Sequence, residues 1–272
     1  MLRFIESLPP GASSSPGRPR GSVGQVKGTL VLIHGFPLSA RMWEPQLELA
    51  QHGWRIIAPQ LSGFDGGTTE TARTSVDDYA GDVIDLLDAL HIHDAVIGGL
   101  SMGGYVTFAM FRYAARYFRG MILADTRAEA DTPEGIDGRK AMLDLLGREG
   151  PSAVAEAIMP KLLCDATREH RPGVEDAIRG FVCSNSPEVI AGAITALMTR
   201  QDATPILSSI HCPTLVLVGD QDALTPPALS ESIHHRIPGS ELVTLAGAGH
   251  MSNMEQPDAF NLALAHFLEH RV

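Results

Sequence analysis

Cysteine and positive charge are both scarce in this sequence of 272 residues. The three cysteines, Cys164, Cys183 and Cys212, form no CxxC pair, which is typical of free thiols rather than of a disulfide framework or a zinc site. Lys and Arg number 21 against 32 Asp and Glu, so the net charge is −11. A chain this acidic is poorly suited to phosphate backbones or anionic lipid surfaces, and we expect neither nucleic acid nor a membrane as a partner.

Long apolar runs are also missing. No stretch of 18 apolar residues occurs, so we predict no transmembrane helix. The opening MLRFIESLPPG has no apolar segment long enough for a secretory signal, which with the free thiols favours a cytoplasmic protein. With 44% apolar and 19% charged residues, the chain has the composition of a globular protein and the length of one large domain, with or without an insertion.

Short apolar runs alternate with amphipathic stretches over most of the chain. The segment from Pro9 to Gln25 is rich in Pro, Gly and Ser and is predicted to be a mobile loop or an extended hairpin arm. The patterns predict strands at 29–35, 54–60, 95–101, 120–126, 213–220 and 240–249, and helices at 40–53, 74–92, 102–117, 226–237 and 256–271. This alternation predicts an α/β fold with a mostly parallel sheet and helices on both faces.

Residues 127–204 interrupt this alternation. Four helical segments follow one another with no strand between them, at 139–149, 152–163, 174–182 and 187–200. A helical insertion in an α/β sheet is most simply a cap over the carboxyl edge of the strands, where such sheets bind ligands. We therefore predict a core domain formed by 1–126 and 205–272, and a helical cap formed by 127–204.

Ser101 stands in the string GLSMGG, where a predicted strand turns into a predicted helix. A sharp turn of this kind strains the serine backbone and crowds the positions two residues away, which here are Gly99 and Gly103. The helix N-terminus behind the serine favours negative charge nearby. A serine among glycines can arise by chance in a chain with 27 glycines, but this position in the fold indicates a nucleophile.

His250 and Asp222 are the candidate base and acid. His250 follows the last predicted strand in a glycine-rich turn, a position that distinguishes it from the other ten histidines. Asp222 lies in the loop after strand 213–220, where a carboxylate can orient an imidazole, and Asp125 is the alternative acid. The resulting chain order of Ser, Asp and His is the one expected for a hydrolase of this arrangement.

The oxyanion hole and the substrate pocket complete the predicted site. The backbone N–H groups of Met102 and Phe36 are the expected oxyanion donors, whereas His34, just before Phe36, is assigned a structural role. Apolar residues of the insertion are candidates for the pocket, although residues at helical spacing are more often core than ligand contacts. These candidates are Met142, Leu145, Leu146, Ile158, Leu162, Phe181 and Met198.

Four motifs together resemble the α/β-hydrolase superfamily: HGFP (34–37), GLSMGG (99–104), GDQDALTPP (219–227) and GAGHMSNMEQP (247–257). The stretch HGFPLSARMWEPQ is similar to the small, cofactor-free serine esterases that group with enol-lactonases, perhydrolases and non-haem haloperoxidases. Two departures stand out. The N-terminus is rich in loop residues where members commonly open on a hairpin, and Gln60 replaces the acidic residue of their D-x-x-G-x-G pattern.

These observations predict a carboxylesterase-type serine hydrolase that acts on small, largely apolar esters through an acyl-enzyme, with no cofactor and no metal. A lactonase or a carbon–carbon hydrolase would use the same residues, with perhydrolase activity as a side reaction. A small-ligand receptor on the same fold is a more remote alternative. In each case the expected partner is a small molecule, an ester or lactone for the enzymes, and the oligomeric state stays open.

Overall fold

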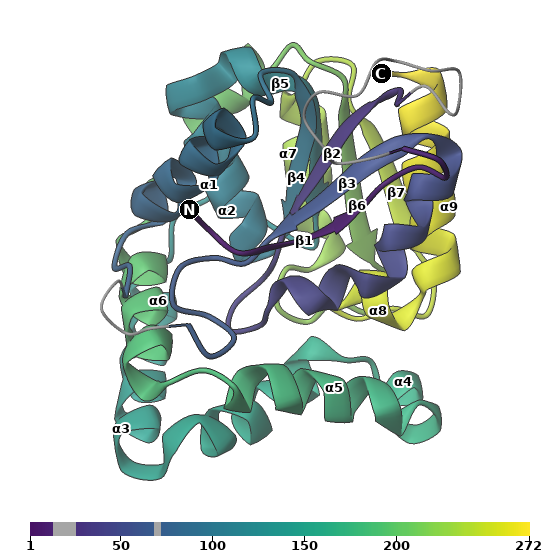
Figure 1. Cartoon of the computed structure of the whole chain (residues 1–272). Helices are drawn as coiled ribbons and strands as arrows, with labels where there is room; N and C mark the ends of the chain where they lie inside the picture. Colours follow the sequence, from purple (N-terminus) through teal and green to yellow (C-terminus); the bar gives the residue numbers. More distant parts are fainter. Residues whose placement is uncertain (13–25, 68–71) are drawn as a thin grey trace.

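The computed structural model describes residues 1–12, 26–67 and 72–272, so most of the predicted 9–25 arm lies outside the described residues. The described chain forms a seven-stranded sheet in the order β1-β3-β2-β4-β5-β6-β7 (Figure 1). The strands are β1 (Phe4–Ser7), β2 (Gly28–Ile33), β3 (Trp54–Pro59), β4 (Ala95–Leu100), β5 (Phe118–Ala124), β6 (Thr214–Gly219) and β7 (Glu241–Leu245). Among the described strands, only β1 pairs antiparallel, with β3. The predicted mostly parallel sheet is therefore confirmed, and β1 is a strand that the sequence reading did not assign.

Helices cover both faces of this sheet. On β2, Leu30 and Leu32 pack into one hydrophobic cluster with 3₁₀ helix η1 (Ala40–His52) and α9 (Pro257–His270). Val31 and Ile33 point to the opposite face, into a second cluster. That second cluster includes buried residues of α1 (Val76–Ala89), α2 (Met102–Ala114) and α7 (Pro227–Arg236). Because successive side chains of a strand alternate between faces, an unbroken apolar run such as Leu30–Ile33 is the pattern of a strand buried on both sides.

The short connecting elements are η3 (Ala115–Tyr117), η4 (Thr204–Ser209) and α8 (Ser252–Glu255).

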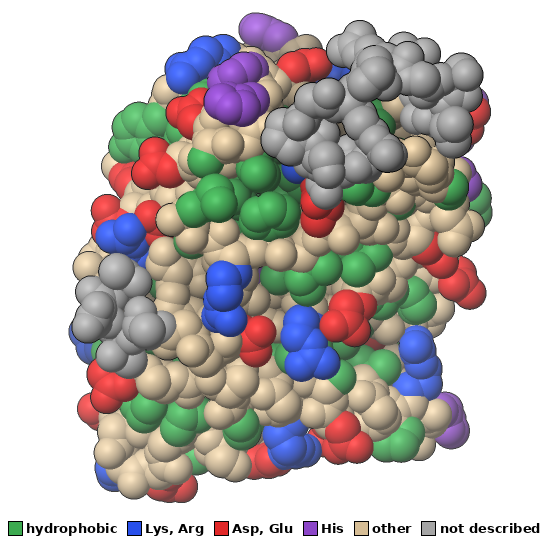
Figure 2. Space-filling model, viewed as in Figure 1, with side chains coloured by type: hydrophobic (Ala, Val, Ile, Leu, Met, Phe, Trp, Pro, Cys, Tyr) green, Lys and Arg blue, Asp and Glu red, His purple; other side chains and the backbone are tan. Residues whose placement is uncertain are grey.

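No single helix among the described residues is long and apolar enough to cross a bilayer. On the face of the molecule shown in Figure 2, acidic and basic side chains are interspersed.

The insertion between β5 and β6 is entirely helical in the described structure. It contains α3 (Pro133–Leu162), α4 (Asp165–His170), α5 (Pro172–Cys183) and α6 (Pro187–Thr199), which lie together beyond one end of the sheet (Figure 1). The first two predicted segments form the two halves of α3, which breaks at Gly150, where φ is 79°. Buried residues of α3, α5 and α6 belong to the same hydrophobic clusters as the sheet, so the insertion is packed continuously onto the core. The division at 127 and 204 stays a prediction.

Candidate active site

Ser101 occupies the sharp turn between β4 and α2, with φ 56° and ψ −114°. Positive φ is costly for a residue with a Cβ and persists only where the surroundings hold it. Here the Ser101 N–H donates to the Ala124 carbonyl at 3.0 Å, and the Ser101 carbonyl accepts from the Gly104 N–H at 2.9 Å and the Thr126 hydroxyl at 2.9 Å. The residues that hold Ser101 thus come from the neighbouring strand end and the first turn of α2.

Gly99 and Gly103 are needed because the backbones around Ser101 approach too closely for side chains. A Cβ built at Gly99 would collide with the backbone of Gly103, and one at Gly103 would collide with the Ile33 carbonyl. The strand-to-helix turn therefore closes only with glycine at both positions, as the sequence reading predicted.

Asp222 and His250 form a buried pair at the carboxyl ends of β6 and β7. Nδ1 of His250 lies 2.9 Å from Oδ2 and 3.0 Å from Oδ1 of Asp222, and both side chains are at most 3% exposed. The Thr225 hydroxyl donates to Oδ2 at 2.6 Å, and the N–H groups of Leu224 and Thr225 donate to Oδ1. The carboxylate is thus fixed by its own loop while it faces the imidazole.

The surroundings of Asp222 favour its ionised form. Burial raises the pKa of Asp222, but the charge of His250 and the hydrogen bonds from His250 and Thr225 outweigh burial and hold this pKa below its ordinary value. An ionised Asp222 accepts a hydrogen bond from the Nδ1–H of His250, which leaves Nε2 as the proton acceptor of the ring.

Asp125, the alternative acid, makes no hydrogen bond to a histidine among the described residues. Its carboxylate instead accepts from the Gly219 N–H at 2.9 Å and from the Ser252 hydroxyl. Burial, followed by the nearby charge of Asp222, raises the pKa of Asp125 well above its ordinary value. Of the two candidate acids, the structure brings only Asp222 to His250.

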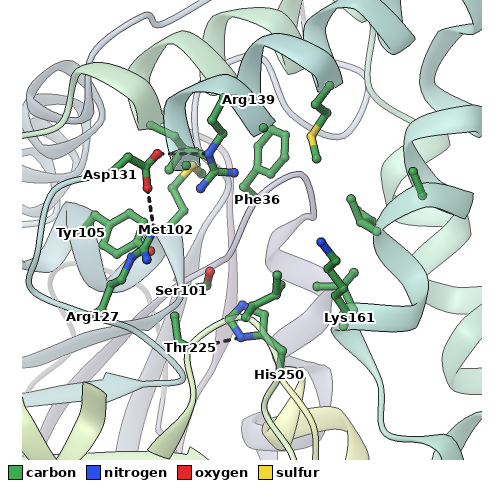
Figure 3. A pocket seen from close by; sticks show the side chains of 18 of the residues that line it. Phe36, Ser101, Met102, Tyr105, Arg127, Asp131, Arg139, Lys161, Thr225 and His250 are labelled. Atoms are coloured by element: carbon green, nitrogen blue, oxygen red, sulfur yellow. Dashed lines mark hydrogen bonds and ion pairs between the residues drawn. The ribbon is translucent and has the colours of Figure 1, made fainter. Parts of the chain in front are cut away.

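A cavity of about 340 Å³ brings the remaining parts of the predicted site together (Figure 3). Ser101, His250 and Thr225 line it, and so do Phe36 and Met102. No hydrogen bond within the described residues joins Ser101 to His250, so they meet as two walls of one cavity. Catalytic hydrogen bonds are often loose before substrate binds and tighten in the complex.

The two predicted oxyanion donors border this cavity as well. Met102 is the first residue of α2, where the N–H has no partner inside the helix. Phe36 belongs to the loop after β2, and neither N–H is hydrogen-bonded to another described part of the chain. Both are thus free to donate to an oxygen in the cavity.

His34 and Gln60 belong to a separate buried network beside the site. Nε2 of His34 accepts the Leu61 N–H at 3.1 Å, and its Nδ1 lies 3.0 Å from the Gly35 carbonyl. Gln60 contacts Nε2 through its amide at 3.3 Å and accepts the Ala40 N–H at 2.9 Å through Oε1. Gln60, which departs from the family pattern, therefore ties two loops together through His34.

Part of the predicted pocket lining is wrong. Met142, Ile158 and Leu162 do line the cavity, but four other candidates do not. Leu146 and Phe181 are buried in the hydrophobic core and Met198 packs against it, while Leu145 is half-buried away from the lining. Many apolar side chains of the insertion pack against the core. Hydrophobicity alone therefore cannot tell a residue that lines the pocket from one that is buried in this packing.

Charged residues that the sequence reading missed occupy much of the lining. They are Arg127, Asp131, Glu134, Arg139 and Lys161, and Tyr105 accompanies them. The cavity-facing positions of α3 run 134, 135, 138, 139 and 142 before the break and 157, 158, 161 and 162 after it. This 3–4 spacing on each half is the signal that could have found them. The expected apolar lining is therefore corrected to a mixed one.

A model of the alpha/beta hydrolase family matches residues 30–263, which is most of the chain. The chain belongs to the alpha/beta hydrolase family. An esterase structure from Thermogutta terrifontis, with malate bound, superposes with a TM-score of 0.88 at 35% identity, covering 98% of this chain and 93% of that one. The enol-lactonase structure from Burkholderia xenovorans has a TM-score of 0.85 at 26% identity, covering 98% and 96%.

Sequence relatives within the family carry similar names. 3-Oxoadipate enol-lactonase 2 from Acinetobacter baylyi is 28% identical over 235 residues, which is 86% of each chain. The resemblance drawn from the four motifs is thus confirmed, and the family is one of hydrolases.

Proposed function

We propose that the protein is a serine hydrolase that cleaves small carboxylic esters, with Ser101 as nucleophile, His250 as base and Asp222 as the acid that orients the base. One observation carries the proposal. The buried Asp222–His250 pair, joined at 2.9 Å, opens into the same cavity as the strained Ser101.

In the proposed reaction, Oγ of Ser101 attacks the ester carbonyl carbon while Nε2 of His250 takes the hydroxyl proton. The carbonyl oxygen becomes an oxyanion that accepts from the N–H groups of Phe36 and Met102. The imidazolium gives its proton to the departing alcohol, which leaves an ester of the acyl group on Ser101. A water molecule, deprotonated by His250, then releases the acid and restores the serine.

The 35% identity to an esterase structure supports a linear ester as substrate, and relatives named enol-lactonases make a lactone the second candidate. A lactone is a cyclic ester, so the same steps open the ring and leave the alcohol attached to the acid. A panel of linear esters and lactones of matched carbon number, compared by kcat/KM, separates the two candidates.

Two further features fit this proposal. We propose that α3 to α6, within residues 127–204, act as the cap of the site, because both halves of α3 line the cavity. The described cysteines Cys164, Cys183 and Cys212 are unpaired, which fits a reducing compartment such as the cytoplasm.

The decisive test is Ser101→Ala, which removes the nucleophile and adds no bulk. We expect kcat/KM for a chromogenic acetate ester to fall at least about a thousandfold. Ser230→Ala is the matched control, since Ser230 is a buried serine of α7 that does not line the cavity, and it should keep wild-type activity. Activity retained by Ser101→Ala would refute the proposed nucleophile.

The pH profile gives a second readout of the same proposal. Turnover should fall towards acid pH, because a protonated imidazole cannot accept the serine proton. A profile that stays flat from about pH 5 to 8 would contradict a histidine base.

A further inference from the structure

The cavity wall above Ser101 holds more positive than negative charge, although the whole chain has a net charge of −11. The charge is organised around Asp131, which is 1% exposed. Its carboxylate pairs with Arg127 at 2.5 Å, with Arg139 at 3.2 Å and with Arg200 at 2.8 Å. Three guanidinium groups thus share one carboxylate, and an excess of positive charge remains beside the cavity.

Arg200 forms the back of this cluster. Its side chain is 2% exposed, lies over the Tyr105 ring at 4.3 Å and donates to the Leu197 and Glu129 carbonyls. Burial raises the pKa of Asp131, but the charges and hydrogen bonds of Arg200 and Arg139 lower it below its ordinary value, so Asp131 is a fixed anion. The cluster is built into the wall and can hold Arg139 in place.

Arg139 and Lys161 both line the cavity with nitrogen atoms that can still donate hydrogen bonds to a ligand. Arg139 uses Nε for Asp131, and its two terminal nitrogens make no other hydrogen bond within the described residues. Lys161 is an exposed residue, and none of the ion pairs among the described residues includes it. Figure 3 shows the two side chains on different sides of the space above Ser101, and both line the cavity.

Glu134, the second anion of the lining, makes no ion pair with Arg139 or Lys161 among the described residues. It is exposed in the first turn of α3, where hydrogen bonds with its own backbone and with the Thr132 side chain lower the pKa of its carboxyl group. The two cations come from the two halves of α3, on either side of the break at Gly150. The break therefore lets one helix place charge on two walls of one cavity.

Resting on the proposed ester hydrolysis, we propose that the substrate carries a carboxylate in addition to its ester, and that Arg139 and Lys161 bind this carboxylate while the ester carbonyl lies at Ser101. Charge-assisted hydrogen bonds to a partly buried carboxylate are strong and directional. A cavity of about 340 Å³ is at the small end of ligand sites. The substrate class is thus a short dicarboxylic monoester, or a small lactone with a carboxylate side chain.

A pair of substrates that differ only in charge tests this proposal. Monomethyl glutarate carries the carboxylate, and methyl 4-carbamoylbutanoate replaces it with a neutral amide of nearly the same shape. We expect the wild-type protein to prefer the anion by about tenfold or more in kcat/KM. Equal kcat/KM for the two esters overturns the proposal.

Variants assign the preference to residues. Arg139→Gln and Lys161→Gln should each lose at least about tenfold more kcat/KM on the anion than on the amide, mainly through KM. Lys140→Gln is the matched control, because Lys140 is an exposed residue of α3 that pairs with Asp137 outside the cavity lining, and its substrate preference should equal that of the wild type. Equal losses of Arg139→Gln and Lys161→Gln on both esters refute the assignment. Lys161→Gln guards against misfolding of the Asp131 cluster, since Lys161 belongs to no pair in it.

A binding measurement separates this inference from the proposed reaction. Glutarate should bind to Ser101→Ala in calorimetry, and Lys161→Gln in that background should weaken binding about tenfold. If glutarate binds but the wild-type protein hydrolyses neither ester, the carboxylate site is retained and the proposed esterase reaction is refuted. If both esters are hydrolysed but glutarate does not bind, the esterase reaction is retained and the carboxylate site is refuted.

Discussion

His34 and His250 lie in two regions of the same sheet edge and are both buried, at 0% and 2% exposed. His34 follows β2; among the described residues its ring hydrogen-bonds the backbone of Gly35 and Leu61 and the amide of Gln60, and it packs edge-on against Phe64. His250 follows β7 and meets the Asp222 carboxylate, with its ring on the cavity. The two histidines are thus equally buried but differ in their partners. Only His250 is paired with a carboxylate and lines the cavity, so only His250 is placed to act as a base.

The pKa of His34 shows what burial does without a paired carboxylate. Burial lowers this pKa from 6.5 to about 4, and the smaller opposing effects of the Gly35 carbonyl and of the Asp65 charge do not offset it. His34 therefore stays neutral and holds two loops, whereas the carboxylate behind His250 stabilises the imidazolium that the proposed reaction needs. Four variants test this contrast.

The largest effect is expected for His250→Ala. Because a nucleophile and its base act as a unit, the loss of kcat should be about as large as that of Ser101→Ala, and the double variant should be little worse. Steady-state kinetics on one chromogenic ester measures all three. Additive losses in the double variant would argue against a shared function.

Asp222→Asn should have the next largest effect. The amide keeps the shape of the side chain but stabilises neither the needed tautomer nor the imidazolium, so kcat should fall. We expect the kcat of Asp222→Asn to stay about 10- to 100-fold above that of His250→Ala. Asp125→Asn is the comparison, since Asp125 bonds Gly219 and Ser252 instead of His250. If Asp125→Asn were the more damaging variant for kcat, the assignment of the acid would be reversed.

Thr225→Val should have a smaller effect on activity. The Thr225 hydroxyl donates to Oδ2 of Asp222 at 2.6 Å and lies 3.3 Å from Nδ1 of His250, so its loss loosens the pair but leaves both members. We expect kcat to fall about tenfold, with a smaller change for Thr225→Ser, which keeps the hydroxyl. If Thr225→Ser lost as much kcat as Thr225→Val, retaining the hydroxyl would not preserve activity, which would contradict the role given to this hydroxyl.

His34→Gln should change activity least, by less than about threefold at pH 8, because glutamine can still accept the Leu61 N–H. Its effect is on stability towards acid. Between pH 6.5 and about 4 the unfolded state binds a proton at His34 that the folded state excludes, so the free energy of unfolding falls as pH falls.

The wild-type protein should therefore lose about 1 to 2 kcal/mol more than His34→Gln between pH 6.5 and 5. Urea unfolding at the two pH values measures this difference. A variant with the same acid dependence as the wild type would show that His34 is not the group responsible.

The sequence by itself determined the sheet, the strained serine and the acid–base pair as candidates. Parallel strands place their carboxyl ends on one edge, so residues that follow separate strands, such as Ser101, Asp222 and His250, converge whatever the details of packing. The glycines at 99 and 103 also carry a local signal, because the close approach of backbones there leaves room for no other residue.

Only the tertiary structure decided which side chains of the insertion face the cavity. Apolar positions on α3 and α5 indicate where these helices pack on the core, and Leu146 and Phe181 are buried in that packing. Arg139 and Lys161 look like solvated surface residues in the sequence and reach the cavity only because α3 breaks at Gly150 and both halves line it. Helical periodicity defines a buried face, but whether the opposite face meets water or a cavity depends on what the rest of the chain places in front of it.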